Sequence, residues 1–178
     1  RDLGARNIAI VADFVDGTLP SDIIGELDLV WASSIAAQRS LLLQTLPVET
    51  DMVTHHVDPR ISAPDSRPDG FSVGYFGEMT NAVKDDAIEK SVRFHAVDTR
   101  TSTTDWLAFV GMFAMHYAVR PQTKGKPAYK PFLKGFTAAR CHANIVVDRN
   151  DGDAIHYLGD DYPYLTEAPT PAEALRVL

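Results

Sequence analysis

Short apolar, β-branched runs alternate along this chain with longer amphipathic segments. Apolar runs of about four to eight residues bounded by turn residues are typical of buried strands, and a 3.6-residue apolar period is typical of helices. Their alternation is the pattern of βαβ units around a buried parallel sheet. The sequence therefore predicts an α/β protein with Rossmann-like parallel sheets. The expected strands are 7–15, 27–32, 51–57, 71–76, 92–96, 115–119 and 144–147, and the expected helices are 35–43, 81–91, 102–113, one that opens at Pro131 and one that begins within 171–178.

A proline- and glycine-rich segment, residues 62–70, interrupts this alternation. Proline removes backbone donors, and aspartate and glycine favour turns, so neither a strand nor a helix can continue through it. We interpret it as a linker between the carboxy-terminal part of one α/β domain, residues 1–61, and a second Rossmann-like domain, residues 71–178. The chain enters its first strand almost at once and ends within a helix, so we expect both ends to be cut and the first domain to be incomplete.

Four lysines lie between Lys124 and Ala139, at the threshold of a predicted helix. Pro131 suits a first helical turn, because the N–H that proline lacks would have no intrahelical partner there. A helix that opens at Pro131 offers free N–H groups and a partial positive charge, to which Lys130 and Lys134, four residues apart, add full charges. The pattern predicts an anion site suited to phosphate. The alternative is a pair of solvated surface lysines.

Composition limits which partners and which cellular location we expect for this protein. A formal charge of −7 over 178 residues argues against general nucleic-acid binding, which usually needs a basic face. No apolar run approaches the roughly 20 residues that a membrane span requires, so we expect no transmembrane segment. The single cysteine, Cys141, excludes an intrachain disulfide framework and favours a reducing, cytoplasmic location. Peripheral membrane association through segments outside this chain stays open.

Several segments in order resemble the carboxy-terminal half of a GT-B glycosyltransferase. They are Gly-Tyr-Phe-Gly at 74–77, Lys-Pro-Phe-Leu-Lys at 130–134, Ala-Asn-Ile-Val-Val at 143–147 and Tyr-Leu-Gly-Asp-Asp-Tyr-Pro-Tyr-Leu at 157–165, preceded by Thr-His-His-Val-Asp-Pro-Arg-Ile at 54–61. The resemblance implies transfer of a sugar from a nucleotide sugar to a hydroxyl of a glycan or another acceptor, without a metal or a further cofactor. The glutamate pair that many retaining members present is not evident, which leaves the stereochemical outcome open.

The resemblance also gives the lysines a function, because basic side chains and helix N-termini compensate the donor diphosphate in that family. The turn after strand 71–76 can approach a ligand closely, although Thr80 fits a helix cap better than a ligand contact. Arg120 follows strand 115–119 at the edge where open α/β sheets bind ligands, where it can pair with phosphate or with a neighbouring carboxylate. The predicted donor-binding residues are Gly77, Thr80, Asn81, Arg120, Tyr129, Lys130 and Lys134.

Candidates for a catalytic base lie on the first domain. His55 and His56 are adjacent on an expected strand, so they point to opposite faces and cannot chelate a metal together. One of them could remove the acceptor proton, or could be an ordinary hydrogen-bonded histidine. Asp16, like Asp13, follows the first strand and could orient the acceptor or act as base, or simply form a turn.

Other activities lack their sequence signatures. The chain has no P-loop, no Gly-x-Gly-x-x-Gly, no His-Glu-x-x-His and no Gly-x-Ser-x-Gly. We interpret Asp151-Gly152-Asp153 as a turn rather than a metal site. Two alternatives remain: a non-catalytic nucleotide- or sugar-phosphate-binding module, and a single-domain flavodoxin-like protein, which needs an uninterrupted five-stranded sheet and against which segment 62–70 argues.

Overall fold

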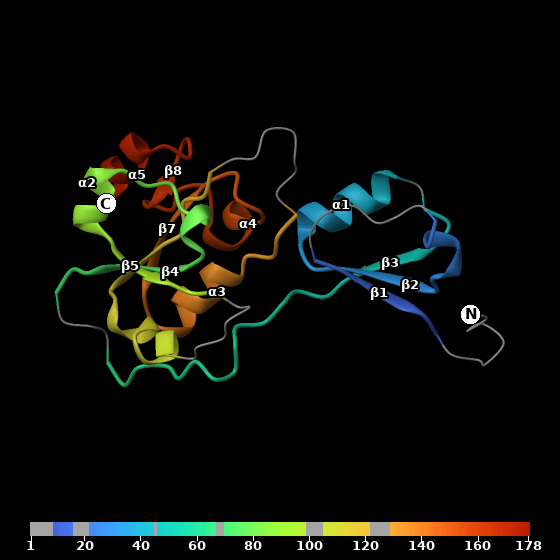
Figure 1. The fold of residues 1–178 in the computed structure, drawn as a ribbon. Coiled ribbons are helices and arrows are strands. Elements are labelled where there is room, and N and C mark those ends of the chain that lie inside the picture. Colours follow the sequence, from blue (N-terminus) through green and yellow to red (C-terminus); the bar gives the residue numbers. More distant parts are fainter. Residues whose placement is uncertain (1–8, 16–21, 45, 67–69, 99–104, 122–128) are drawn as a thin grey trace. The chain divides into compact units, whose positions relative to one another are not determined.

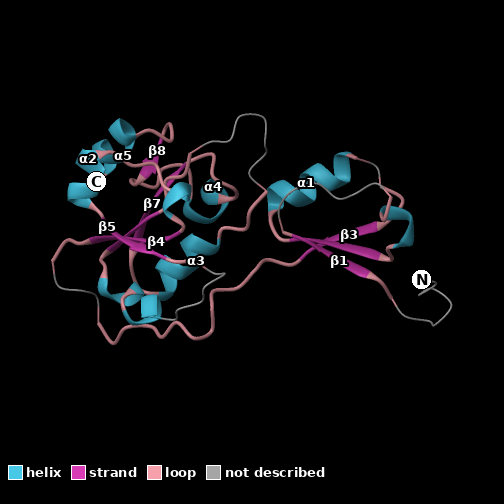
Figure 2. Cartoon of the chain, in the orientation of Figure 1, coloured by secondary structure: helices cyan, strands magenta, loops and turns pink. Residues whose placement is uncertain are grey.

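The computed structural model describes residues 9–15, 22–44, 46–66, 70–98, 105–121 and 129–178. Two compact units are present: unit 1 comprises Arg1–His55 and Lys126–Phe132, and unit 2 comprises His56–Gly125 and Leu133–Leu178. Each unit contains a parallel sheet with helices (Figures 1 and 2). The predicted α/β class with Rossmann-like parallel sheets is confirmed, whereas the predicted domain limits around 62–70 remain a prediction.

Unit 1 contains a three-stranded sheet in the order β1-β2-β3, with all strands parallel. The strands are β1 (Val11–Phe14), β2 (Leu29–Ala32) and β3 (Glu49–Met52). The 3-10 helix η2 (Ile24–Glu26) precedes β2, and helix α1 (Ile35–Leu43) follows it. Ser34 starts α1 by accepting a hydrogen bond from the N–H of Ala37, and α1 buries Ala37 and Leu41 against the sheet. The predicted helix 35–43 is confirmed with its cap.

Unit 2 contains a five-stranded parallel sheet in the order β5-β4-β6-β7-β8. Its strands are β4 (Val73–Gly77), β5 (Arg93–Ala96), β6 (Met115–Tyr117), β7 (Asn144–Asp148) and β8 (Leu165–Thr166). Numbered within the unit, this order is 2-1-3-4-5, which is the order of flavodoxin-like folds. All five strands follow segment 62–70, so that segment does not interrupt the sheet. The sequence argument that this segment excludes an uninterrupted five-stranded sheet was therefore wrong. A single-domain protein still does not fit, because unit 1 has a sheet of its own.

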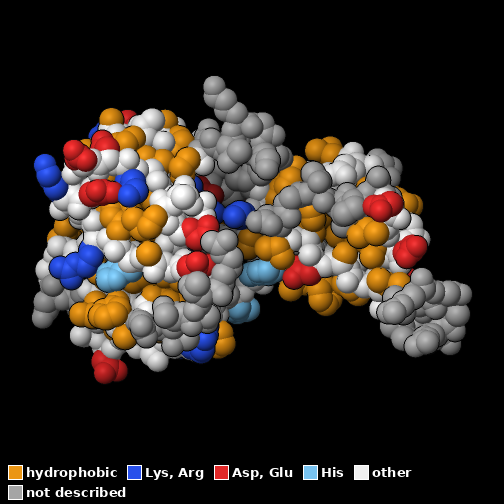
Figure 3. All heavy atoms as spheres, in the orientation of Figure 1, with side chains coloured by type: hydrophobic (Ala, Val, Ile, Leu, Met, Phe, Trp, Pro, Cys, Tyr) orange, Lys and Arg blue, Asp and Glu red, His pale blue; other side chains and the backbone are white. Residues whose placement is uncertain are grey.

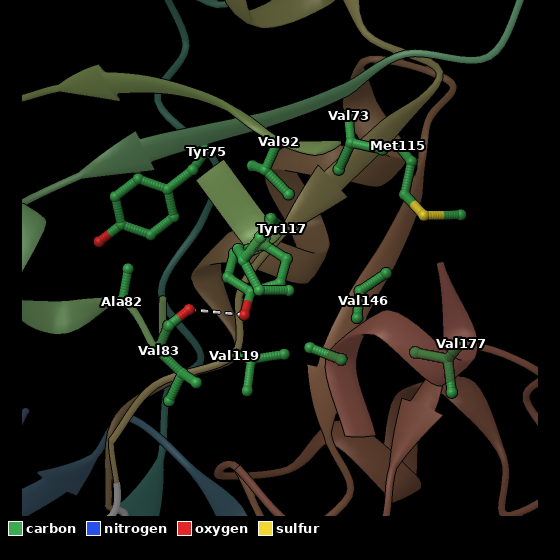
Figure 4. Packing of buried hydrophobic residues seen from close by; sticks show 12 residues of the cluster. Val73, Tyr75, Ala82, Val83, Val92, Met115, Tyr117, Val119, Val146 and Val177 are labelled. Carbon is green, nitrogen blue, oxygen red and sulfur yellow. Dashed lines mark hydrogen bonds between the residues drawn. The ribbon is translucent and has the colours of Figure 1, made fainter. Parts of the chain in front are cut away.

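Helices cover both faces of the unit 2 sheet. Helix α2 (Asp86–Ser91) packs beside α5 (Pro171–Val177), as Figure 1 shows, and together they bury Ile88, Ala174 and Val177. Figure 4 shows the core on this side, where Tyr75 and Tyr117 lie among valines from strands β4 and β7, helix α5 and connecting segments. Helix α3 (Leu133–Arg140) packs on β6 and β7, and α4 (Ala154–Leu158) follows β7. Helix α5 confirms the helix that was predicted within 171–178.

Several predicted elements differ from the structure in type or bounds. Within 81–91 only Asp86–Ser91 is α-helical, because the Asp85 carboxylate accepts the N–H groups of Ala87 and Ile88 and starts the helix there. Residues 105–113 form the 3-10 helices η4 (Asp105–Ala108) and η5 (Val110–Met112) instead of one α-helix, and Gly111 and Val110 favour helix only weakly. The strand predicted at 51–57 lies at Glu49–Met52, because it ends where its partner β2 ends, at the pair of Ala32 and Met52.

Two short elements of unit 2 were not predicted. Strand β8 has two residues, and α4 has five, so neither is long enough to show a hydrophobic period. The sequence consequently predicted four strands in this domain, and the structure has five. None of the helices in the described part of the chain has both the length and the apolar character that crossing a membrane requires.

Gly74 in β4 allows the aromatic ring of Phe113 to lie flat against the strand. A Cβ at this position would come within 2.6 Å of Phe113 Cγ, and a buried ring cannot move away freely. We expect Gly74→Ala to lower the free energy of unfolding by about 1–3 kcal/mol through overpacking, measured by urea denaturation.

Gly111→Ala is the matched control for this substitution. The nearest atom to its added Cβ would be a Pro64 carbon at 3.9 Å, an ordinary contact. We expect it to change stability by less than about 0.5 kcal/mol. Equal stability of the two variants would contradict the packing described for Gly74.

Candidate functional site

The candidate site lies in unit 2, at the carboxyl ends of β4 and β6. From β4 the chain crosses to β5 on one side and then returns to β6 on the other, so the order of strands reverses between β4 and β6. In open α/β sheets the crevice outside the carboxyl ends at such a switch point is where ligands bind. Gly77 is the last residue of β4, and Arg120 follows three residues after β6.

Gly77 brings the end of β4 against the side chains of Tyr75 and Lys134. Its φ of 154° is a conformation that residues with side chains rarely adopt. A Cβ on Gly77 would lie 2.9 Å from the Tyr75 hydroxyl and 3.4 Å from Lys134 Nζ. Glycine is therefore required here both for backbone conformation and for the close approach of the lysine.

Lys134, in the first turn of α3, contributes a buried positive charge next to Gly77. Its Nζ is buried and lies 4.0 Å from the centroid of the Tyr75 ring, a distance typical of a cation–π contact. Burial raises the pKa of Tyr75 to about 12, so its hydroxyl stays protonated and donates to the carbonyl of Glu78 at 2.6 Å. The tyrosine thus holds Lys134 on its ring face and fixes the turn after β4 through its hydroxyl.

Arg120 is the second basic side chain of the site. Its Nε donates to Asp151 Oδ2 at 3.0 Å, and its side chain is 25% exposed against 12% for Asp151. Burial raises the pKa of the Asp151 carboxyl, and the nearby Arg120 and Lys134 oppose that rise. Of the two partners that the sequence left open for Arg120, the structure contains the carboxylate.

Asp151 is the site residue whose role the sequence reasoning missed. It was interpreted only as part of a turn, and a turn is what the chain forms there. The usable signal was topological: acidic residues follow β7, and β7 is the neighbour of β6, whose carboxyl end leads to Arg120. Parallel neighbours bring the residues after them to one edge of the sheet.

The two remaining candidates near Gly77 lie on the 3-10 helix η3 (Met79–Asn81). Thr80 is exposed and does not cap α2, which Asp85 caps, so the helix-cap interpretation of Thr80 was wrong. Asn81 is exposed, and its side-chain amide donates to Glu78 Oε2 at 3.2 Å. Both residues lie in the turn that leaves the end of β4.

Tyr129 and Lys130 belong to unit 1, whereas Lys134 belongs to unit 2. The Tyr129 carbonyl accepts a hydrogen bond from Ser34 Oγ at 2.6 Å, and the Tyr129 hydroxyl lies 2.8 Å from Ser40 Oγ, so this tyrosine packs on α1. Lys130 is exposed and precedes α3, which begins at Leu133 rather than at Pro131. The prediction that this helix opens at Pro131 was therefore wrong, because the first helical turn starts after Phe132.

Of the candidate bases, His55 lies in unit 1, three residues after the end of β3. His55 Nε2 lies 3.4 Å from Asp13 Oδ2, with side chains 32% and 52% exposed. His56 is exposed and falls in unit 2. Asp16 lies outside the described residues. Of these candidates, the structure brings only His55 and Asp13 together, and a carboxylate next to an imidazole can orient it for proton transfer.

Metal binding has no support among residues that the structure describes. They contain no group of three or more His, Cys, Asp or Glu side chains that could hold a metal ion. Asp148 and Asp153 are buried near Asp151, but one Asp148 oxygen accepts the N–H of Asn150 at 2.8 Å, which is a turn contact. The site is therefore a pair of basic side chains with one carboxylate at the switch point.

Known proteins add nothing to this geometry, since the sequence matches no model of a known family and no curated protein.

Proposed function

We propose that this chain is the donor-binding part of a glycosyltransferase, in which unit 2 binds the phosphate groups of a nucleotide sugar. The observation that carries the proposal is that Gly77 lies against Lys134 at the switch point between β4 and β6, and that Lys134 and Arg120 both act on the carboxyl of Asp151. Two positive charges and a close backbone approach at this edge suit a diphosphate. The resemblance of segments 74–77, 130–134 and 157–165 to GT-B enzymes supports the sugar-transfer part of the proposal.

The two basic residues would act at different depths. Arg120 is partly exposed, and Asp151 contacts its guanidinium through Nε, so its other two nitrogens can donate to an incoming phosphate. Lys134 adds its charge next to the Gly77 backbone. Charges held in position before the reaction stabilise the negative charge that builds on a leaving diphosphate. The proton acceptor for the hydroxyl remains a hypothesis that rests on His55, His56 and Asp16.

We expect Arg120→Gln and Lys134→Gln each to weaken nucleotide diphosphate binding about tenfold or more, because each removes a positive charge from the proposed phosphate site. Isothermal titration of the whole chain with UDP, GDP and ADP, and with inorganic pyrophosphate, measures this. Arg176→Gln is the matched control, since Arg176 pairs with Glu173 on α5. The proposal fails if wild-type protein binds none of the four probes, or if the site variants bind them as the control does.

The second candidate is a phosphate-binding module without turnover. The strand order 2-1-3-4-5 favours it, because flavodoxin-like sheets bind a mononucleotide phosphate at the same switch point. Incubation with nucleotide sugars separates the two candidates. A transferase releases nucleoside diphosphate from at least one donor, whereas a module is stabilised against heat by nucleotide and releases none.

A further inference from the structure

A cavity lies in unit 2 on the side of the sheet opposite to the candidate site, beside the amino-terminal ends of β4 and β5. Its volume is about 510 Å³, which lies within the range of small-molecule sites. The wall is formed by the start of β4, the end of α2, strand β5 and the segment around η5. The lining residues used below are Val73, Lys90, Arg93, His95, Phe109 and Met112.

Three aromatic rings form a nearly parallel column that reaches this cavity. The His95 ring lies 5.0 Å from Phe76 at an interplanar angle of 9°, and 5.5 Å from Phe109 at 15°. Phe113 meets both Phe76 and His95 edge-on, each at 5.6 Å, and so holds the column in place. Phe109 ends the column and is 43% exposed. A planar aromatic ring can therefore extend the column by stacking on Phe109.

The histidine in the column behaves as an uncharged aromatic ring. Burial lowers the pKa of His95, and the nearby Arg93 lowers it further, so the imidazole is neutral near pH 7. Its Nε2 is buried and has no hydrogen-bond partner within the described ranges. His95 therefore adds a flat surface to the column and no positive charge.

The rim of the cavity carries positive charge. Glu89 is the acidic residue of the lining, and Lys84 neutralises it at 2.7 Å. Lys90 and Arg93 line the same cavity, and neither forms an ion pair in the part of the chain that the structure describes. In Figure 3, basic and histidine side chains lie beside hydrophobic ones on the visible face of unit 2, over β5. Two uncompensated positive charges thus border an apolar, aromatic floor.

We propose that this cavity binds a small planar aromatic anion, whose ring stacks on Phe109 and whose carboxylate or phosphate pairs with Arg93 and Lys90. The apolar contacts come from Val73 and from Met112, whose flexible thioether is 61% exposed and can adapt to the edge of a ring. The ring of such a ligand matches the apolar and aromatic residues of the lining, and its anionic group matches the basic residues. This site is separate from the carboxyl-end site around Arg120.

Titration of the whole chain with 2-naphthoate and with AMP tests the proposal and distinguishes carboxylate from phosphate as the anion. We expect one of them to bind, and we expect cyclohexanecarboxylate, which has the charge without a planar ring, to bind at least about tenfold more weakly. The uncharged 2-naphthylmethanol should bind more weakly by a similar factor, because it lacks the anionic group that pairs with Arg93. Failure of both aromatic anions to bind would overturn the proposal.

Variants localise the binding. Arg93→Gln should weaken binding of the probe about tenfold or more. Phe109→Leu, which keeps an apolar side chain, should weaken binding about three- to tenfold. The matched controls Arg39→Gln and Trp31→Leu change exposed residues of unit 1 and should bind as wild type does. Circular dichroism confirms that each variant is folded. Equal binding by the cavity variants and the controls would overturn the proposal.

Arg120→Gln makes the two proposals independent. It removes a residue of the carboxyl-end site and should leave binding of the aromatic probe unchanged. If Arg120→Gln weakens binding of the aromatic probe and Arg93→Gln does not, the probe binds at the carboxyl-end site and the cavity proposal is wrong.

Discussion

Replacement of Tyr117 by alanine should lower the free energy of unfolding of unit 2 by about 3–5 kcal/mol, because it removes a buried aromatic ring from the centre of the core. Tyr117 is 1% exposed, and its ring contacts those of Tyr75 and Phe94 at centroid distances of 6.4 and 6.2 Å. Its hydroxyl donates to the carbonyl of Val83 at 2.7 Å (Figure 4). Urea denaturation followed by circular dichroism measures the loss.

Two further variants separate the contributions of Tyr117. Tyr117→Phe keeps the ring and removes the donor of the Val83 carbonyl, so we expect a smaller loss of about 1–3 kcal/mol. Phe71→Ala removes a ring that is 67% exposed and should change stability by less than about 0.5 kcal/mol. If Tyr117→Ala costs no more than Phe71→Ala, the packing described for this core is wrong.

Acidification below pH 6.5 should destabilise unit 2 through His116. This side chain is 5% exposed, and its Nε2 bonds the carbonyl of Val110 at 2.9 Å. Burial lowers the pKa of His116 to about 4 from the 6.5 of an exposed histidine, although the bond to Val110 opposes the shift. Between these two pH values the unfolded chain binds a proton that the folded chain does not, so stability present above pH 6.5 is lost as the pH falls towards 4. The total amounts to about 3 kcal/mol.

Because carboxylates also titrate in acid, the measurement is a difference between variants. His116→Gln keeps an N–H donor for Val110 but cannot be protonated, so its stability should fall by about 2–3 kcal/mol less than that of wild type between pH 7 and pH 4.5. His156→Gln, which changes an exposed histidine of α4, should follow the wild-type curve. Identical pH dependence of His116→Gln and wild type would show that His116 is not buried in its neutral form.

Part of the candidate site could be predicted from local sequence. Gly77 was expected to allow a close backbone approach, and it has a φ of 154° with Lys134 Nζ close to where a Cβ would be. Arg120 was expected at the carboxyl edge of a strand, with a phosphate or a carboxylate as partner. The identity of that carboxylate, Asp151, depends on β7 lying next to β6, which no local pattern reports.

The aromatic cavity could not be predicted at all. Nothing in the sequence around His95 or His116 indicates which rings these histidines contact. The His95 ring packs against Phe76 of β4 and against Phe109 and Phe113 on either side of η5. The His116 ring packs against Phe76, 40 residues earlier in the chain. These contacts depend on the order of the strands in the sheet and on the two 3-10 helices η4 and η5, which form where the sequence predicted one α-helix. The pattern of apolar residues predicts neither the strand order nor the 3-10 helices.

The sequence by itself determined the α/β class, the position of most strands, and the limits and cap of helix α1, because these depend on side chains within a few residues of one another. Only the tertiary structure decided the order β5-β4-β6-β7-β8, the assignment of Lys130 and Lys134 to different units, and the contacts of Gly77 with Lys134 and of Arg120 with Asp151. The physical reason is that these features minimise the exposed apolar surface of segments far apart in the chain, and burial between distant segments leaves no local period to read.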